Sequence, residues 1–204
     1  MVKRRNIFFT SDLHIGHSNC IDFDNRPFKD VDHMTQYFIQ QWNKQVKPWD
    51  IVYSLGDMFW NTVPKKKIRE ILQQLNGEIH LVIGNHDKLT VQQALRLGFR
   101  SACYECILKI AGKYCRVSHY PYRFSKIKHY KTLFKEFLKG TLKNRGFARH
   151  MEKRPVNDGR FLIHGHSHSK EKVNGNAINV AVTAWKYKLA SLTDIEKLIL
   201  NQKH

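Results

Sequence analysis

Residues that can bind metal ions follow five predicted strands of this 204-residue chain, each at the point where the strand ends. In α/β sheets, sites form outside the carboxyl ends of the strands, so side chains from distant parts of the sequence can converge there. The pattern therefore predicts one shared site. Its candidate residues are Asp12 and His14 after the first strand, Asp57 after the second, Asn85, His86 and Asp87 after the third, His119 after the fourth, and His166 and His168 after the fifth.

The side-chain types in this set indicate a catalytic metal site. Imidazole and carboxylate ligands suit manganese, iron, zinc or nickel better than calcium or magnesium. The set has no thiolate, which favours an open catalytic centre over a sealed structural one. Gly56, Gly84 and Gly165 stand beside the expected ligands, where glycine lets the backbone turn sharply. Each motif alone could be an ordinary turn or a hydrogen-bonded histidine, but all five in order favour a metal site.

The order of these motifs resembles that of the calcineurin-like metallophosphoesterases. The patterns Asp-x-His, Gly-Asp, Gly-Asn-His-Asp, His and Gly-His-x-His follow one another as in that family, from Ser11 to His168, with only residues 123–154 outside the resemblance. The chain is also similar to a small bacterial and phage-type branch of the family. That similarity lies in the segments Ser11-Asp12-Leu13-His14-Ile15-Gly16-His17, Arg26-Pro27-Phe28 and Ser118-His119-Tyr120-Pro121.

The resemblance implies a fold, a cofactor and a ligand set. The fold would be a four-layer α-β-β-α sandwich of two mixed β-sheets, in a single domain over residues 1–204. The cofactor would be two divalent metal ions, with manganese as the first expectation and iron, zinc or nickel as alternatives. Asp57 would bridge both ions, because a carboxylate has two oxygens. The first ion would be held by Asp12, His14, Asp57 and His168, and the second by Asp57, Asn85, His119 and His166.

His86 is the predicted catalytic residue. The two metal ions would activate a bridging hydroxide for in-line attack on phosphorus. His86 stands beside a ligand in the sequence but is not expected to be a ligand itself. It would either protonate the leaving oxygen or stabilise the charge that develops there. The neighbouring Asp87 could orient a histidine or cap its own loop.

Three further residues each have a functional and a structural interpretation. His17 could touch the substrate phosphate or form a structural hydrogen bond. Arg26, in a loop stiffened by Pro27, could bind a phosphate through two parallel hydrogen bonds. Trp185 could stack on a base, but packing in the core is the simpler interpretation.

Local sequence patterns predict the elements that would position these residues. Thr193 and Glu196 have the spacing of a capping box that opens a C-terminal helix. Strands that alternate with helices, and later pair with each other, predict a layered α/β fold with mixed sheets. The predicted strands are 7–10, 51–55, 79–83, 161–163 and 177–182, the predicted helices are 31–46, 65–75 and 91–97, and a hairpin of 106–111 and 114–118 is expected to turn at Gly112 and Lys113.

The composition is that of a globular protein with a strongly basic surface. Hydrophobic residues make up 42% of the chain, and 35 Lys and Arg against 17 Asp and Glu give a formal net charge of +18. Such a surface attracts polyanions, although it could also only aid solubility. The four cysteines are expected to be reduced thiols, although Cys103 and Cys106 have the spacing of half a zinc knuckle.

The sequence predicts neither export nor membrane insertion. The apolar run at 7–9 is too short for the core of a signal peptide. No stretch approaches the roughly 18 apolar residues of a membrane span. The expected location is therefore the cytoplasm, and the oligomeric state leaves no readable pattern.

Residues 123–154 are predicted to form a basic, helical insertion near the site, with eleven Lys and Arg and two acids. A stripe of lysines among aromatic residues can follow a nucleic-acid backbone, or it can be a solvated helix face. Three functions stay open. The protein could be a phosphodiesterase acting on nucleotide-type or other small phosphoesters, a nuclease acting on DNA or RNA through the insertion, or a non-catalytic binding module. The lysines of the stripe are Lys128, Lys131, Lys135, Lys139 and Lys143.

Overall fold

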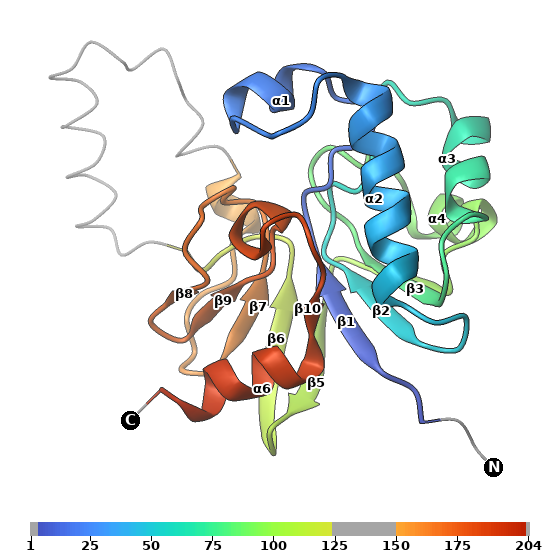
Figure 1. The fold of residues 1–204 in the computed structure, drawn as a ribbon. Coiled ribbons are helices and arrows are strands. Elements are labelled where there is room, and N and C mark those ends of the chain that lie inside the picture. Colours follow the sequence, from blue (N-terminus) through green and yellow to red (C-terminus); the bar gives the residue numbers. More distant parts are fainter. Residues whose placement is uncertain (1–3, 124–149, 203–204) are drawn as a thin grey trace, which may run out of the picture.

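Two five-stranded sheets pack against each other in the computed structural model, which describes residues 4–123 and 150–202 (Figure 1). The first sheet has the order β10-β1-β2-β3-β4 and the second the order β5-β6-β7-β9-β8. Both are mixed, which confirms the predicted α/β fold. The first comprises β1 (Ile7–Thr10), β2 (Ile51–Ser54), β3 (Glu78–Val82), β4 (Ser101–Cys103) and β10 (Ala190–Ser191); the second comprises β5 (Glu105–Ile110), β6 (Lys113–Ser118), β7 (Leu162–His164), β8 (Val173–Asn174) and β9 (Ala177–Asn179).

Three helices cover the outer face of the first sheet: α2 (Val31–Gln45), α3 (Lys65–Leu72) and α4 (Val91–Leu97) (Figure 1). The α2 helix begins at Asp30, whose side chain accepts a hydrogen bond from the His33 amide at 2.7 Å. Its Trp42 is completely buried and donates its indole N–H to the Asn76 carbonyl at 2.8 Å. This layer supports the sheet from behind and leaves the carboxyl ends of its strands open.

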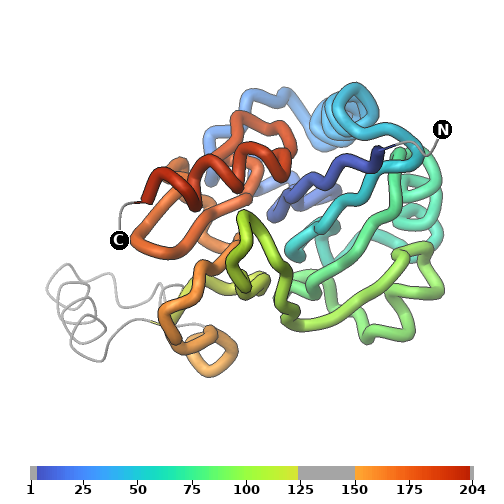
Figure 2. Tube along the Cα trace, turned by 90° about the horizontal axis from the view of Figure 1, so that it is seen from below, coloured from blue at the N-terminus to red at the C-terminus, as the bar shows by residue number. Residues whose placement is uncertain are grey.

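A second apolar core lies between the sheets. Phe9 and Leu55 from the first sheet and its following loop pack in it with Ile163 and Ile178 from the second, and all four are fully buried. The α6 helix (Leu192–Leu200) adds its buried face to this core and packs against β10, β1 and β5 (Figure 2). Burying apolar surface from both sheets in one core fixes how they sit relative to each other.

The parallel pairing of β1 with β2 and of β2 with β3 places the carboxyl ends of these strands at one edge. In the second sheet, β6 and β7 are also parallel. The pairing continues past the strands, because the Asp12 amide donates to the Gly56 carbonyl at 3.0 Å and the Gly165 amide donates to the His119 carbonyl at 3.1 Å. The loops that carry the expected ligands are therefore held in register by the backbone itself.

Some predicted boundaries were wrong. The hairpin of β5 and β6 turns at Ala111 and Gly112, one residue earlier than predicted, since these are the two positions with positive φ. The C-terminal helix is opened by a capping box of Ser191 and Asp194 rather than of Thr193 and Glu196. The last predicted strand stops at Asn179, because the chain then turns into a 3₁₀ helix, η2 (Val182–Trp185).

The helix α1 (Asn19–Phe23) and the short strands β4, β8 and β10 were not predicted. A single 3₁₀ turn, η1 (Met151–Lys153), belongs to the predicted insertion. The lysine stripe of that insertion lies outside the described residues. No helix in the described part of the chain is long and apolar enough to cross a membrane. The cysteines are free thiols, as expected.

Candidate metal centre

The loops after β1, β2, β3, β6 and β7 bring the expected ligands together in two adjacent groups. In the first group, the Nε2 atoms of His14 and His168 are 3.0 Å apart. Asp12 Oδ1 lies 3.4 Å from His168 Nε2 and 3.8 Å from His14 Nε2. Three donor atoms from both sheets thus surround one point, as a metal ion requires.

The second group is built in the same way from the other loops. His119 Nε2 lies 2.9 Å from Asn85 Oδ1 and 3.2 Å from His166 Nδ1. It also lies 3.5 Å from Asp57 Oδ2. His119 directs Nε2 into the site because its Nδ1 faces the Leu55 carbonyl at 2.7 Å, which fixes the ring orientation.

Asp57 connects the two groups. Its Oδ2 atom is 3.5 Å from His119 in the second group and 4.0 Å from His14 in the first. The side chain is nearly inaccessible to solvent. A carboxylate oxygen between two sets of imidazole nitrogens is the arrangement expected of a bridging ligand.

Each aspartate directs one oxygen into the site and uses the other to hold a loop. Asp12 Oδ2 accepts a hydrogen bond from the His166 amide at 2.8 Å. Asp57 Oδ1 accepts one from the His86 amide at 2.8 Å. The first bond joins the two sheets, and the second joins neighbouring loops of the first sheet. Both carboxylates are therefore held rigidly before any ion binds.

Two glycines are required by this close approach of backbone to carboxylate. A Cβ atom at Gly165 would lie 2.5 Å from Asp12 Oδ2 and 2.0 Å from Ser11 Oγ. One at Gly84 would lie 2.3 Å from Asp57 Oδ1. Gly56 instead has a φ of +87°, so it serves as the turn residue that the sequence predicted.

Backbone strain is concentrated at the expected ligands. A positive φ costs a non-glycine residue about 1–2 kcal/mol, and such residues tend to cluster at functional sites. The surrounding structure must stabilise these conformations. Five of the seven expected ligands have a positive φ: Asp12 (59°), His14 (52°), Asp57 (53°), His166 (67°) and His168 (47°).

The residues fit a pair of divalent cations. Asp12 Oδ1 is buried and accepts no hydrogen bond from the described residues. Leaving a buried carboxylate oxygen in that state is unfavourable, and a cation would relieve it. The surrounding donors are imidazole nitrogens and carboxylate or amide oxygens, a set that suits transition metals.

The electrostatics of the site keep most of its histidines ready to bind metal. Burial lowers the pKa of His166 to about 3, and the nearby His119 adds to this effect. Burial likewise holds the pKa of His14 well below its ordinary value. Neutral imidazoles at these positions present a lone pair to an ion.

His168 and Asp57 are different. Burial disfavours the charged His168, but the attraction of the Asp12 carboxylate and the hydrogen bonds and attraction of Asp24 outweigh it and raise its pKa to about 10. Burial raises the pKa of Asp57 to about 7, against the attraction of His119. Without metal, His168 is therefore protonated at neutral pH and Asp57 is partly protonated, and an ion must displace these protons.

His86 lies at the site without joining either group of ligands. Its Nε2 is 4.0 Å from Asp57 Oδ2, and about a third of its side chain is exposed. It lines a cavity of about 650 Å³ that also contains His14, Asp57 and His168. Burial lowers its pKa to about 4, and the neighbouring histidines add to this effect.

The same cavity has aromatic walls that the sequence did not reveal. Trp60 packs against His86, with ring centroids 4.6 Å apart, and against His17, with ring centroids 3.6 Å apart. Phe23, at the end of α1, lines the cavity and is 78% exposed. Lys88 contributes a positive charge. No spacing rule marks these residues, because they reach the cavity from three separate loops or helices.

His17 and Arg26, the two predicted substrate contacts, lie in different surroundings. His17 lines the cavity and accepts a hydrogen bond from the Cys20 amide at 2.8 Å, so both of its interpretations stay compatible with its position. The Arg26 side chain has no exposed surface. A buried guanidinium cannot reach a phosphate in the cavity, so the expected substrate contact of Arg26 is wrong.

Asp87 and Trp185 have structural roles. Asp87 accepts hydrogen bonds from the backbone amides of Asp57, Met58 and Gly84, which is the loop-capping alternative and not the orientation of a histidine. Trp185 packs at the core between the sheets, as the simpler interpretation predicted, and donates its indole N–H to Asn179.

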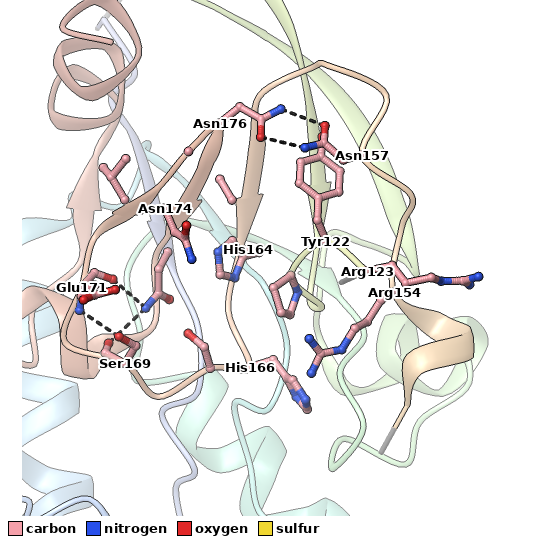
Figure 3. Close-up of a pocket in the computed structure, with 16 residues that line it drawn as sticks. Tyr122, Arg123, Arg154, Asn157, His164, His166, Ser169, Glu171, Asn174 and Asn176 are labelled. Carbon is pink, nitrogen blue, oxygen red and sulfur yellow. Dashed lines mark hydrogen bonds between the residues drawn. The ribbon is translucent and has the colours of Figure 1, made fainter. Parts of the chain in front are cut away.

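A second cavity, of about 620 Å³, shares His166 with the first (Figure 3). Figure 3 shows the Arg154 guanidinium directed toward His166 at its lower edge. Two of the side-chain amides that line this second cavity already have partners in the protein, because Asn157 and Asn176 hydrogen-bond to each other at 3.1 and 3.0 Å. The convergent ring nitrogens and carboxylates instead face the first cavity, which makes that cavity the candidate active site.

Comparison with known proteins agrees with this site. The family model of the calcineurin-like phosphoesterases matches residues 5–186. An uncharacterised protein of Methanocaldococcus jannaschii is 32% identical, over 97% of this chain and 93% of its own length. The Gene 66 protein of a Mycobacterium phage is 28% identical, over 95% of this chain and 94% of its own. A solved structure of a protein of unknown function from Aquifex aeolicus is 27% identical, with a TM-score of 0.66, covering 96% of this chain and all of its own.

Metal binding at pH 7 is expected to release at least one proton, because His168 is protonated there and Asp57 is partly protonated. Since protons and metal compete for the same atoms, metal affinity should rise from pH 6 to pH 8. Calorimetric titration of Mn²⁺ in two buffers of different ionisation enthalpy measures the release. Identical heats in both buffers would contradict the assignment, and His168→Asn should reduce the number of protons released.

Proposed function

Because the chain belongs to the calcineurin-like phosphoesterase family and is a phosphoric ester hydrolase, we propose that it is a phosphodiesterase using two divalent cations. Its substrates would be nucleotide-type or other small phosphoesters. Manganese is the proposed metal, with iron, zinc or nickel as alternatives, since the donor set suits all four.

The observation that carries this proposal is the position of Asp57. Its Oδ2 faces both groups of donors, at 3.5 Å from His119 and 4.0 Å from His14. A single ion would need only one of these groups. Two groups sharing a buried carboxylate support a pair of ions and the chemistry that a pair permits.

Bound divalent cations lower the pKa of a coordinated water and neutralise charge on the phosphate oxygens. The protein's own contribution is to hold the donors in place and to shape the cavity. The hydrogen bonds from the His166 and His86 amides hold Asp12 and Asp57 rigidly. A preorganised polar site of this kind needs little rearrangement as charge develops in the transition state.

His86 would act on the leaving oxygen. Its pKa of about 4 means that the ring is neutral at pH 7, and nearby cations would lower that pKa further. A neutral imidazole still donates one N–H. We therefore favour stabilisation of the leaving oxygen by a hydrogen bond over proton transfer from an imidazolium.

The side chains that line the cavity favour a substrate that carries a flat ring. Trp60 and the exposed Phe23 offer aromatic surface beside the candidate ligands, and Lys88 offers a positive charge. Aromatic side chains stack on nucleobases with little dependence on sequence. A nucleotide diester fits this combination of aromatic surface, positive charge and donor groups for metal.

A nuclease is the second candidate, favoured by the net charge of +18. Such a charge steers polyanions to the protein from a distance. A nuclease would hold several phosphates of one strand at once, whereas a small diester has a single one. The two functions therefore differ in how binding responds to salt.

Replacing Asp57 tests the proposal directly. Asp57→Asn keeps the shape of the side chain but removes the shared negative charge, so at least one ion should be lost. Turnover should fall on the order of a thousandfold, as expected when several kcal/mol of transition-state stabilisation disappear. Metal analysis and steady-state kinetics measure both. Asp158→Asn, on an exposed loop, is the control, and unchanged metal content and turnover in Asp57→Asn would refute the two-metal scheme.

The His86→Ala variant should keep both ions and lose about 10²- to 10⁴-fold in rate. The loss should be greatest for substrates with poor leaving groups, because these develop the most charge on the leaving oxygen. Kinetics with a series of aryl and alkyl diesters would show this trend. His80→Ala is a matched control, since His80 lies on β3 away from the site. An equal loss for every leaving group would argue against the assigned role.

A substrate panel with added Mn²⁺ separates the two candidate functions. A small-molecule phosphodiesterase should cleave bis-p-nitrophenyl phosphate faster than p-nitrophenyl phosphate, with a shallow dependence on salt. A nuclease should cleave a single-stranded oligonucleotide, with an affinity that falls steeply as salt rises. Steep salt dependence together with oligonucleotide cleavage would reject the small-molecule proposal.

A further inference from the structure

Arg26 is a buried positive charge that lies beneath the first group of metal donors. Its side chain has no exposed surface. It donates hydrogen bonds to the backbone carbonyl of Leu13 at 2.8 Å and to that of Asp12 at 3.0 Å. These carbonyls belong to the strained loop after β1, in which Asp12 and His14 have positive φ. The guanidinium therefore holds the part of the backbone that positions two candidate ligands.

The same guanidinium also holds Asp24. Its Nε and Nη2 atoms both donate to Asp24 Oδ2, at 3.0 and 2.9 Å. Asp24 follows the helix α1, and its side chain is 11% exposed. One rigid arginine fork thus joins the loop after β1 to the end of α1, a geometry that a lysine ammonium cannot reproduce.

Asp24 in turn orients His168. His168 Nδ1 lies 3.0 Å from Asp24 Oδ1 and 2.9 Å from Oδ2, so it donates to the carboxylate. This leaves Nε2 as the nitrogen that faces Asp12 and His14. A carboxylate behind a ligating histidine fixes the tautomer and ring orientation and makes the ligand more basic.

We propose that Arg26 and Asp24 are positioning residues for the first metal ion. Arg26 sets the backbone that carries Asp12 and, through Asp24, sets the imidazole of His168. This role deepens the proposed two-metal function and rests on it. It also explains why a charge is buried here, since a fully paired guanidinium can organise groups from separate segments.

The network acts on one ion and not on the other. In the second group, His119 is oriented by the backbone carbonyl of Leu55. Within the described residues, the side-chain hydrogen bonds of Arg26 and Asp24 join these two residues to each other and to Asp12, Leu13, Met34 and His168, and none of these partners is assigned to the second ion alone. Disrupting the network should therefore weaken the first site and leave the second site unchanged.

Metal titration of the full chain tests this selectivity. Mn²⁺ binding to wild type, Arg26→Lys and Asp24→Asn would be measured by calorimetry, without substrate. Each variant should lose about ten- to a hundredfold in affinity at one site, the range typical for removing such partners, and keep wild-type affinity at the other. Asp24→Asn alters a side chain near the surface, so it provides the result if Arg26→Lys fails to fold.

A double-mutant cycle shows whether Asp24 acts through His168. In a His168→Ala background, Asp24→Asn should cause no further loss of metal affinity. Arg116→Lys is the matched control, because Arg116 also joins two carboxylates, those of Glu105 and Asp158, away from the site. It should leave both sites unchanged.

Three results would overturn the inference: wild-type affinity at both sites in Arg26→Lys and Asp24→Asn, equal weakening of both sites, or a full additional loss in the His168→Ala background. The proposed function fails in a different way, because wild type itself would then bind fewer than two ions.

Discussion

Two buried carboxylates determine how the rest of the site is organised. Asp12 and Asp57 each accept a backbone amide on one oxygen and present the other to the donor groups. The amide that Asp12 accepts comes from His166, in the other sheet. Because this bond crosses between the sheets, the site can form only when the core between them has packed, and the packing of Phe9 and Ile163 is therefore coupled to the geometry of the ligands.

The strain in the ligand loops follows from the same arrangement. Several donor atoms must point at one small volume from short loops, which forces five expected ligands into left-handed backbone conformations. Gly84 and Gly165 permit the contact, since any side chain there would overlap with the carboxylates. Burial, strain and lost hydration all disfavour the site without an ion, so metal binding and local stability are linked.

The two halves of the site are built by different means. The second group depends mainly on the sheets, because the ring of His119 is oriented by the backbone at the end of β2. The first group depends on the segment from α1 to Arg26, which lies outside both sheets. That segment supplies Asp24 behind His168 and Phe23 at the wall of the cavity. Its sequence thus contributes to holding the metal and to shaping the cavity for substrate.

The sequence by itself determined the fold class, the positions of the main strands and the identity of the residues that converge. This was possible because strand and helix periodicity are local, and because Asp12, Asp57, Asn85, His119 and His166 all follow strand ends. The partners of buried polar groups were decided only by the tertiary structure. Arg26 and Asp87 both looked able to act on substrate or ligands, yet Arg26 holds Leu13 and Asp24, and Asp87 caps its own loop and that of Asp57. Such choices depend on which carbonyls and amides the packed loops bring within 3 Å, and nothing in the local sequence encodes that distance.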